Sequence, residues 1–146
     1  MADYLDYLTE MRRALHARPE TAYREFSTQE LITRELGRIG IPYRKAGTGV
    51  IAKVSAGRAK AIAFRADMDA LPIAEENDVP YKSQVPGVMH ACGHDGHMAL
   101  LLAFAAYCSQ NPDKMAADAV FIFQPAEEGE GGAVRMIEAG ALDGVD

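Results

Sequence analysis

The chain has 146 residues, of which 49% are hydrophobic and 25% charged, as is typical of one globular domain. Its 21 acidic and 15 basic residues give a net charge of −6, which disfavours binding to nucleic acid or to an anionic membrane. The first residues lack a basic region followed by an apolar core, so we expect no signal peptide. Two cysteines are too few for a disulfide framework, and a reducing, cytoplasmic setting is predicted.

The first forty residues carry two helical patterns. Apolar residues in 4–17 recur at helical spacing, and the pattern ends at Arg18-Pro19-Glu20. Ser27-Thr28-Gln29-Glu30 has the pattern of a capping box and predicts the start of a second helix, which Gly40 closes.

Residues 47–67 predict strands. Gly47-Thr48-Gly49 is typical of a turn, and residues 50–54 and 61–65 are β-rich runs around a short loop, which predicts a pair of strands. Residues 67–86 contain three prolines and mixed polarity, which indicates a long irregular loop of the kind that is usually functional.

The second half of the chain also alternates between helical and strand patterns. Residues 97–107 predict a buried helix, whose apolar stretch is too short to span a bilayer. Residues 119–123 predict an apolar strand, and 131–139 a further helix. This alternation indicates an α/β fold with a mostly parallel sheet, in which the polar groups that follow strands converge at one edge.

The segment from Met89 to His97 holds three of the four histidines and one of the two cysteines. Cys92 and His94 are separated by a glycine, which lets both side chains face one ion. An isolated Cys-x-His pair is more often a loop cysteine beside an exposed histidine. The crowding of acidic and imidazole groups around this pair instead favours a metal site.

Two acidic pairs follow predicted strands. In an extended segment Glu127 and Glu128 point to opposite sides, so that one could bind an ion while the other stays free as a general base. A solvated acidic loop is the alternative. Asp67 and Asp69 are spaced to share one side, where either could bind a metal or hold a ligating histidine, and a turn or capping role is an equal alternative.

The remaining candidates have weaker patterns. We expect His97 to open the following helix as a cap-region or supporting residue, and His90 receives no definite role. We expect His16 to be a surface or packing residue and Cys108 to be buried and inert.

Three segments, 65–72, 89–97 and 123–129, resemble motifs of one family in order and spacing. This family is the zinc-dependent amidohydrolases that include hippurate hydrolase, N-acetyl-diaminopimelate deacetylase and the indole-3-acetyl-amino-acid hydrolases. They are grouped with the aminoacylase and carboxypeptidase G-like metallopeptidases. The resemblance covers essentially the whole chain.

The resemblance implies a zinc-exopeptidase-like catalytic domain, in which a mostly parallel or mixed sheet lies between layers of helices. It implies two divalent ions, of zinc, manganese, nickel or cobalt, with Cys92, His94 and Glu128 as ligands. Glu127 matches the general base, and Asp69 matches a catalytic residue that supports the metal site; no ligand role is carried onto Asp67. The implied reaction is hydrolysis of N-acyl amino acids such as hippurate by a metal-activated water.

Members of this family continue beyond the length of this chain, with a lid or dimerisation domain and further histidine ligands. We therefore expect residues 1–146 to be the N-terminal part of the catalytic domain and to have little activity alone. We expect the full-length enzyme to be a homo-oligomer that acts on small-molecule N-acyl amino acids, without a nucleic-acid or membrane partner.

Two other functions are compatible with these residues. One is a non-catalytic metal-binding protein that uses Cys92 and His94. The other is a metal-free cysteine hydrolase in which Cys92 is the nucleophile and His94 or His97 the base.

Overall fold

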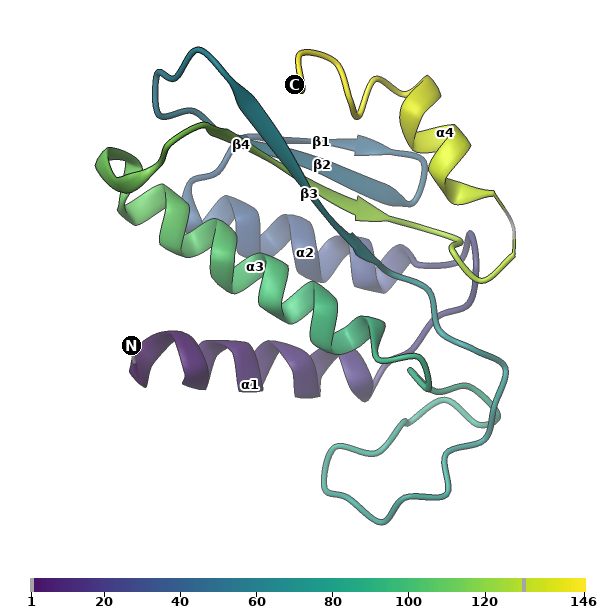
Figure 1. Cartoon of the computed structure of the whole chain (residues 1–146). Helices are drawn as coiled ribbons and strands as arrows, with labels where there is room; N and C mark the ends of the chain where they lie inside the picture. The colour runs from purple at the N-terminus through teal and green to yellow at the C-terminus, as the bar shows by residue number, and fades with distance from the viewer. Residues whose placement is uncertain (1, 130) are drawn as a thin grey trace.

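The computed structural model describes residues 2–129 and 131–146, and within them a four-stranded mixed sheet is flanked by helices (Figure 1). The elements in chain order are α1 (Ala2–His16), α2 (Phe26–Ile39), β1 (Tyr43–Ala46), β2 (Gly49–Val54), β3 (Ala61–Asp67), α3 (His94–Gln110), the short 3-10 turn η1 (Pro112–Lys114), β4 (Asp118–Gln124) and α4 (Gly132–Glu138). The predicted α/β class is confirmed. No helix of the described part is both long and apolar enough to cross a membrane.

The strand order is β1-β2-β4-β3. β1 and β2 form an antiparallel hairpin, β2 and β4 are also antiparallel, and β3 and β4 are parallel. We expected a mostly parallel or a mixed sheet, and over the described strands the sheet is mixed. β2 and β3 both form, but the prediction that they make a pair is wrong, because β4 lies between them.

β4 lies between β2 and β3, and all seven of its residues are buried. Its side chains alternate between two hydrophobic clusters, one on each face of the sheet. The larger cluster lies under α1, α2 and α3 and includes Leu36, Met98, Leu102, Phe121 and Phe123. The smaller lies on the α4 face and includes Ile51, Val120, Ile122 and Met136. The result is a three-layer arrangement, with α1 packed against α3 (Figure 1).

The second helix begins one residue before the proposed capping box, and no side-chain cap from its N-cap residue Glu25 is present. Instead the carboxylate of Glu20 accepts hydrogen bonds from the backbone N–H groups of Ser27 and Thr28, at 3.1 and 2.9 Å. The capping-box prediction is therefore wrong, although the helix itself and its end at the left-handed Gly40 are confirmed.

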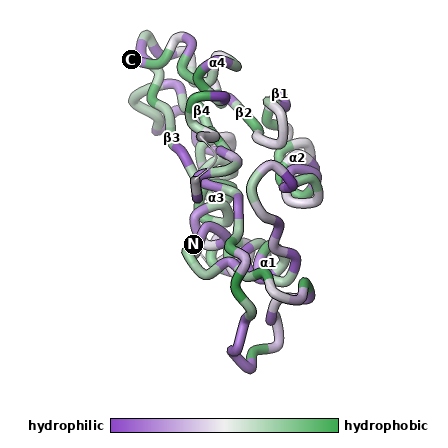
Figure 2. Tube along the Cα trace, turned by 90° about the vertical axis from the view of Figure 1, so that its right-hand side faces the viewer, coloured by the Kyte–Doolittle hydropathy of each residue, from purple (hydrophilic) through white to green (hydrophobic). Residues whose placement is uncertain are grey.

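The segment after β3 is irregular up to α3, as expected. It projects beyond the helices and has a hydrophilic tip (Figures 1 and 2). Its two ends are joined by a bridge in which Leu71 and Met89 exchange backbone hydrogen bonds of 3.1 Å. This bridge brings the chain back beside the segment that follows β3, just before Cys92 and the start of α3.

Candidate metal centre

The carboxyl ends of β3 and β4 lie side by side. Asp67 pairs with Gln124, and the backbone N–H of Met68 donates to the Gln124 carbonyl at 2.8 Å. The segments that carry Asp69 and Glu128 therefore leave the sheet next to each other. This convergence at one edge was expected from the order of strands and acidic pairs.

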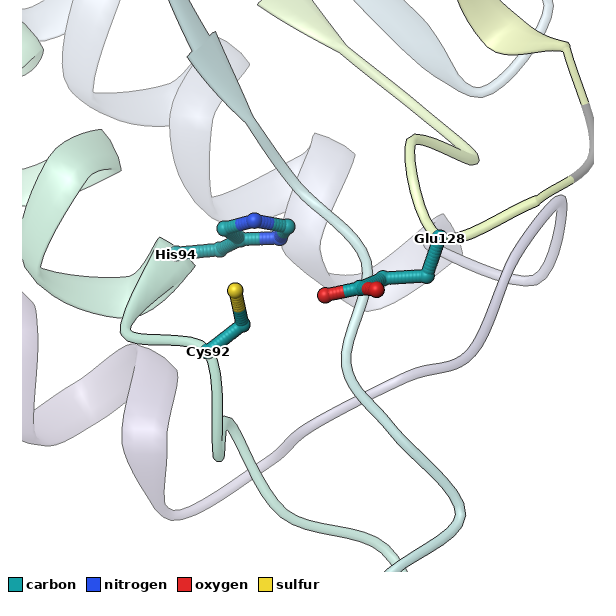
Figure 3. A group of neighbouring side chains, drawn as sticks. All are labelled: Cys92, His94 and Glu128. Carbon is teal, nitrogen blue, oxygen red and sulfur yellow. The ribbon is translucent and has the colours of Figure 1, made fainter.

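Cys92, His94 and Glu128 come together at this edge (Figure 3). Each contributes one potential ligand atom, and these atoms all lie within 4.8 Å of one another. Cys92 and Glu128 are exposed, whereas His94 is buried in the first turn of α3. Gly93 between the first two has a φ of +83°, a left-handed conformation that favours glycine.

The ring of His94 is held by Asp69. Its Nδ1 lies 2.9 Å from the Asp69 carbonyl oxygen and 3.5 Å from the carboxylate Oδ1. The Asp69 carboxylate, followed by the carbonyl, raises the pKa of His94 to about 9 against the opposing effect of burial. Because Nδ1 is occupied, Nε2 is the atom that His94 has left for an ion.

Asp69 is 1% exposed and also contacts the other side of the site. Its Oδ2 accepts the backbone N–H of Glu128 at 2.9 Å. Burial raises the pKa of Asp69, but the contacts from His94 and from the backbone N–H groups of Glu128 and Glu127 outweigh burial and lower it. Asp69 thus ties the histidine to the loop that carries Glu128 without joining the cluster.

Glu127 and Glu128 lie in a turn, so the expected extended segment is wrong. The turn is tight: the backbone N–H of Gly129 donates to the Glu127 carbonyl at 2.7 Å. The side chain of Glu127 is 40% exposed, and its Oε2 lies 4.0 Å from His94 Nε2. The structure therefore places Glu128 with Cys92 and His94, and Glu127 beside them.

The turn begins with Ala126, whose φ of +53° is unusual for a residue with a Cβ. Glu25, which is fully buried, accepts the Ala126 N–H at 3.0 Å and the Thr48 hydroxyl at 2.7 Å. Gly132 packs so closely that a Cβ there would lie 1.7 Å from the Pro125 carbonyl oxygen. Sequence reasoning missed Glu25, because a charged residue before a helix usually lies in solvent.

The surroundings of Cys92 are acidic. A hydrogen bond with Glu128, partial burial and the charges of Glu128, Glu127 and Asp69 all raise the pKa of Cys92. A nucleophilic cysteine needs the opposite environment, in which positive charge stabilises the thiolate. This site therefore disfavours a metal-free cysteine hydrolase.

The other candidates lie outside the cluster. His97 is exposed, with its ring centroid 6.1 Å from that of His94, and the expectation that it opens the helix is wrong because α3 begins at His94. Asp67 pairs with Arg65 at 2.9 Å. Burial raises the pKa of Cys108, as expected of an inert thiol, and burial lowers the pKa of His90 to about 4.

A model of the family described as peptidase family M20/M25/M40 matches residues 63–146, which is more than half of the chain. The chain belongs to this family. The M20 relatives include IAA-amino acid hydrolase ILR1-like 5 of Arabidopsis thaliana, 43% identical over 145 residues. They also include thermostable carboxypeptidase 2 of Saccharolobus solfataricus, 46% identical over 147 residues. The matches cover 98% and 97% of this chain but only 33% and 37% of the two relatives.

A solved M20 structure agrees with this fold along the whole chain. The YXEP protein of Bacillus subtilis, described as a dinuclear metal-binding peptidase, is similar with a TM-score of 0.95 and 41% sequence identity. The similarity covers 100% of this chain and 42% of that protein. The family expected from the three M20 motifs is therefore confirmed, as is the catalytic-domain fold.

Proposed function

We propose that the chain forms part of a metal-dependent amidohydrolase that cleaves the amide bond of N-acyl amino acids. The observation that carries this proposal is the meeting of Cys92, His94 and Glu128 within 4.8 Å, with the carboxylate of Glu127 beside them. The names of two relatives, an IAA-amino acid hydrolase and a carboxypeptidase, support hydrolysis next to an amino acid.

The donor set fits a borderline-soft divalent ion. Thiolate, imidazole and carboxylate groups suit zinc, cobalt, nickel or manganese, whereas magnesium and calcium prefer oxygen ligands alone. Three protein ligands are the usual number for one catalytic zinc ion. Since a close relative is described as dinuclear, we propose that the complete enzyme holds two ions. The second ion then needs ligands beyond this cluster. We propose that residues 1–146 form the N-terminal part of the catalytic domain and that the rest of the enzyme supplies these ligands.

A divalent ion at this site supplies Lewis acidity toward water and the amide carbonyl. Glu127 accepts the proton of the attacking water and passes it to the leaving amine. Its position supports this role, because it lies 4.0 Å from His94 Nε2 and is not in the ligand cluster. Asp69 keeps Nδ1 of His94 occupied, which would leave Nε2 to bind the ion.

The test separates proton transfer from metal binding, in an enzyme with the length of its relatives. We expect Glu127→Gln to keep its metal content while hydrolysis of N-acyl amino acids falls by about 100-fold or more. We expect Glu128→Gln to lose metal and activity together. Glu76→Gln, at an exposed position of the projecting loop, is the matched control and should change neither.

Metal analysis and steady-state kinetics give the readouts. Equal loss of metal and activity in Glu127→Gln would favour a non-catalytic binding role for this pair. Undiminished turnover in Glu127→Gln would refute Glu127 as the general base. A cytoplasmic setting and a homo-oligomeric complete enzyme remain predictions.

A further inference from the structure

A second group of charged side chains lies buried behind the metal centre. It consists of His16 at the end of α1, Glu75 in the projecting loop and Asp95 in the first turn of α3, with Arg12 at its edge. His16 is 4% exposed, so the expectation of a surface position is wrong. These four residues have no role in the reaction proposed above.

The imidazole of His16 lies between two carboxylates. Its Nδ1 is 2.8 Å from Asp95 Oδ2, and its Nε2 is 3.0 Å from Glu75 Oε1. Each ring nitrogen therefore lies within hydrogen-bond distance of a different carboxylate, so that the ring joins the two. Arg12 Nε adds a contact of 3.2 Å to the same Asp95 oxygen.

Each carboxylate holds a different segment of the site. Asp95 directly follows His94 and fixes the start of α3 against α1. Glu75 accepts the backbone N–H of Ser83 at 2.6 Å, and so holds the loop that returns to Cys92. One histidine ring therefore links the projecting loop to the first turn of α3, which contains His94 and directly follows the segment of Cys92.

His90 is a further buried histidine on the segment that leads to the thiol. It precedes Cys92 by two residues and is 4% exposed, and among the described residues neither of its ring nitrogens has a hydrogen-bond partner. Burying so many ionic groups gains little stability, because desolvation opposes their attraction and apolar residues of similar size often do better. The arrangement is better explained by the geometry it imposes.

We propose that His16 is a positioning residue that, through Glu75 and Asp95, holds the segment of Cys92 and His94 in place for metal binding. This inference rests on the proposed function, because it requires that the cluster binds an ion. It predicts that the contacts of His16 with Glu75 and Asp95 are needed for metal affinity, although none of these three residues belongs to the ligand cluster.

The experiment titrates the 146-residue chain with Co2+, whose thiolate complexes absorb in the near ultraviolet. We expect Glu75→Ala, which removes one arm of the bridge, to weaken Co2+ binding by about 10-fold or more and to alter the thiolate band. Glu75→Gln keeps an acceptor for Ser83 and a partner for His16, so its affinity should stay within about 3-fold of wild type. His16→Gln cannot reach both carboxylates and should resemble Glu75→Ala.

The control is Asp118→Ala, which removes a buried carboxylate at the opposite end of β4. Asp118 accepts the Ala56 and Arg58 N–H groups, so its loss lowers the melting temperature without touching the site. We expect Co2+ affinity in this variant to stay within about 2-fold of wild type. Hydrogen exchange should increase in residues 75–91 of Glu75→Ala and His16→Gln but not of the control.

The outcomes separate the two proposals. If Glu75→Ala and His16→Gln melt earlier but bind Co2+ with wild-type affinity and spectrum, the positioning role is refuted and the bridge is only structural. If the wild-type chain gives no thiolate-to-Co2+ band at all, the metal centre itself is refuted. Weakened binding in Glu75→Ala with recovery in Glu75→Gln supports the inference.

Discussion

Replacing Asp69 with asparagine tests how the site controls the charge of His94. Asparagine keeps an oxygen that accepts the Glu128 N–H but removes the negative charge beside Nδ1. In the metal-free protein the folded pKa of His94 is raised from 6.5 to about 9. Its contribution to stability is therefore complete below pH 6.5 and is lost as the pH rises through about 9.

The size of the effect follows from the shift. Since one pKa unit corresponds to about 1.4 kcal/mol, the His94 shift contributes about 3 kcal/mol at the acid end of this range. The side chain of His94 is 5% exposed, so screening by solvent is limited. Asp69, whose own pKa is lowered, stays ionised throughout this window. We expect Asp69→Asn to lose about 3 kcal/mol at pH ~6 but far less at pH ~9.5.

The assay is urea unfolding in the presence of a chelator, on both sides of this pH window. The difference in unfolding free energy between wild type and Asp69→Asn should shrink as the pH rises. Asp118→Asn removes a carboxylate far from His94 and should give a difference that does not vary over the window. If the difference in unfolding free energy between wild type and Asp69→Asn also stays constant with pH, the Asp69 charge does not hold the proton on His94.

Three further substitutions test the loop and the ligand cluster. Ala126→Gly should relieve the strain of the positive φ and raise the unfolding free energy by up to about 1 kcal/mol. The more flexible turn should hold Glu128 less firmly and weaken Co2+ binding. A loss of stability in this variant would contradict this account. Gly132→Ala should lower the unfolding free energy by about 2 kcal/mol or more, because its Cβ meets the Pro125 carbonyl, and urea unfolding with no measurable change would rule this out. Cys92→Ala should weaken zinc binding on the order of 100-fold with little change in metal-free melting, since the side chain is exposed; calorimetry showing unchanged affinity would place the ion elsewhere.

The local parts of the fold were predictable from the sequence. Apolar runs marked β2, β3 and β4, and Gly40 marked the end of α2. The position of β4 between β2 and β3 was not, because strand order depends on pairing between segments far apart in the chain. For the same reason the cap that Glu20 gives α2 replaces the cap predicted from adjacent residues.

The ligand residues of the candidate site were predictable from the sequence, but the buried residues around them were not. The density of ligand-type residues pointed to Cys92 and His94, and the family resemblance added Glu128; the structure brings all three together. The predicted start of α3 was three residues late, because Gly93 and Gly96 interrupt the helical pattern. The burial of His16 was not predictable, because the loop that contributes Glu75 to it lies far away in the sequence.

The central place of β4 has a consequence for the order in which the protein can fold. In the part of the chain that the structure describes, β3 pairs with β4 alone, and β4 follows the other three strands in the sequence. β1 and β2 can form a hairpin early, whereas β3 has to wait, together with the segment that carries Asp69. Closing these long-range pairings is slow, and it brings Asp69 and Glu128 together in the same step. The cluster of Cys92, His94 and Glu128 is therefore expected to form only after β4 has entered the sheet beside β3.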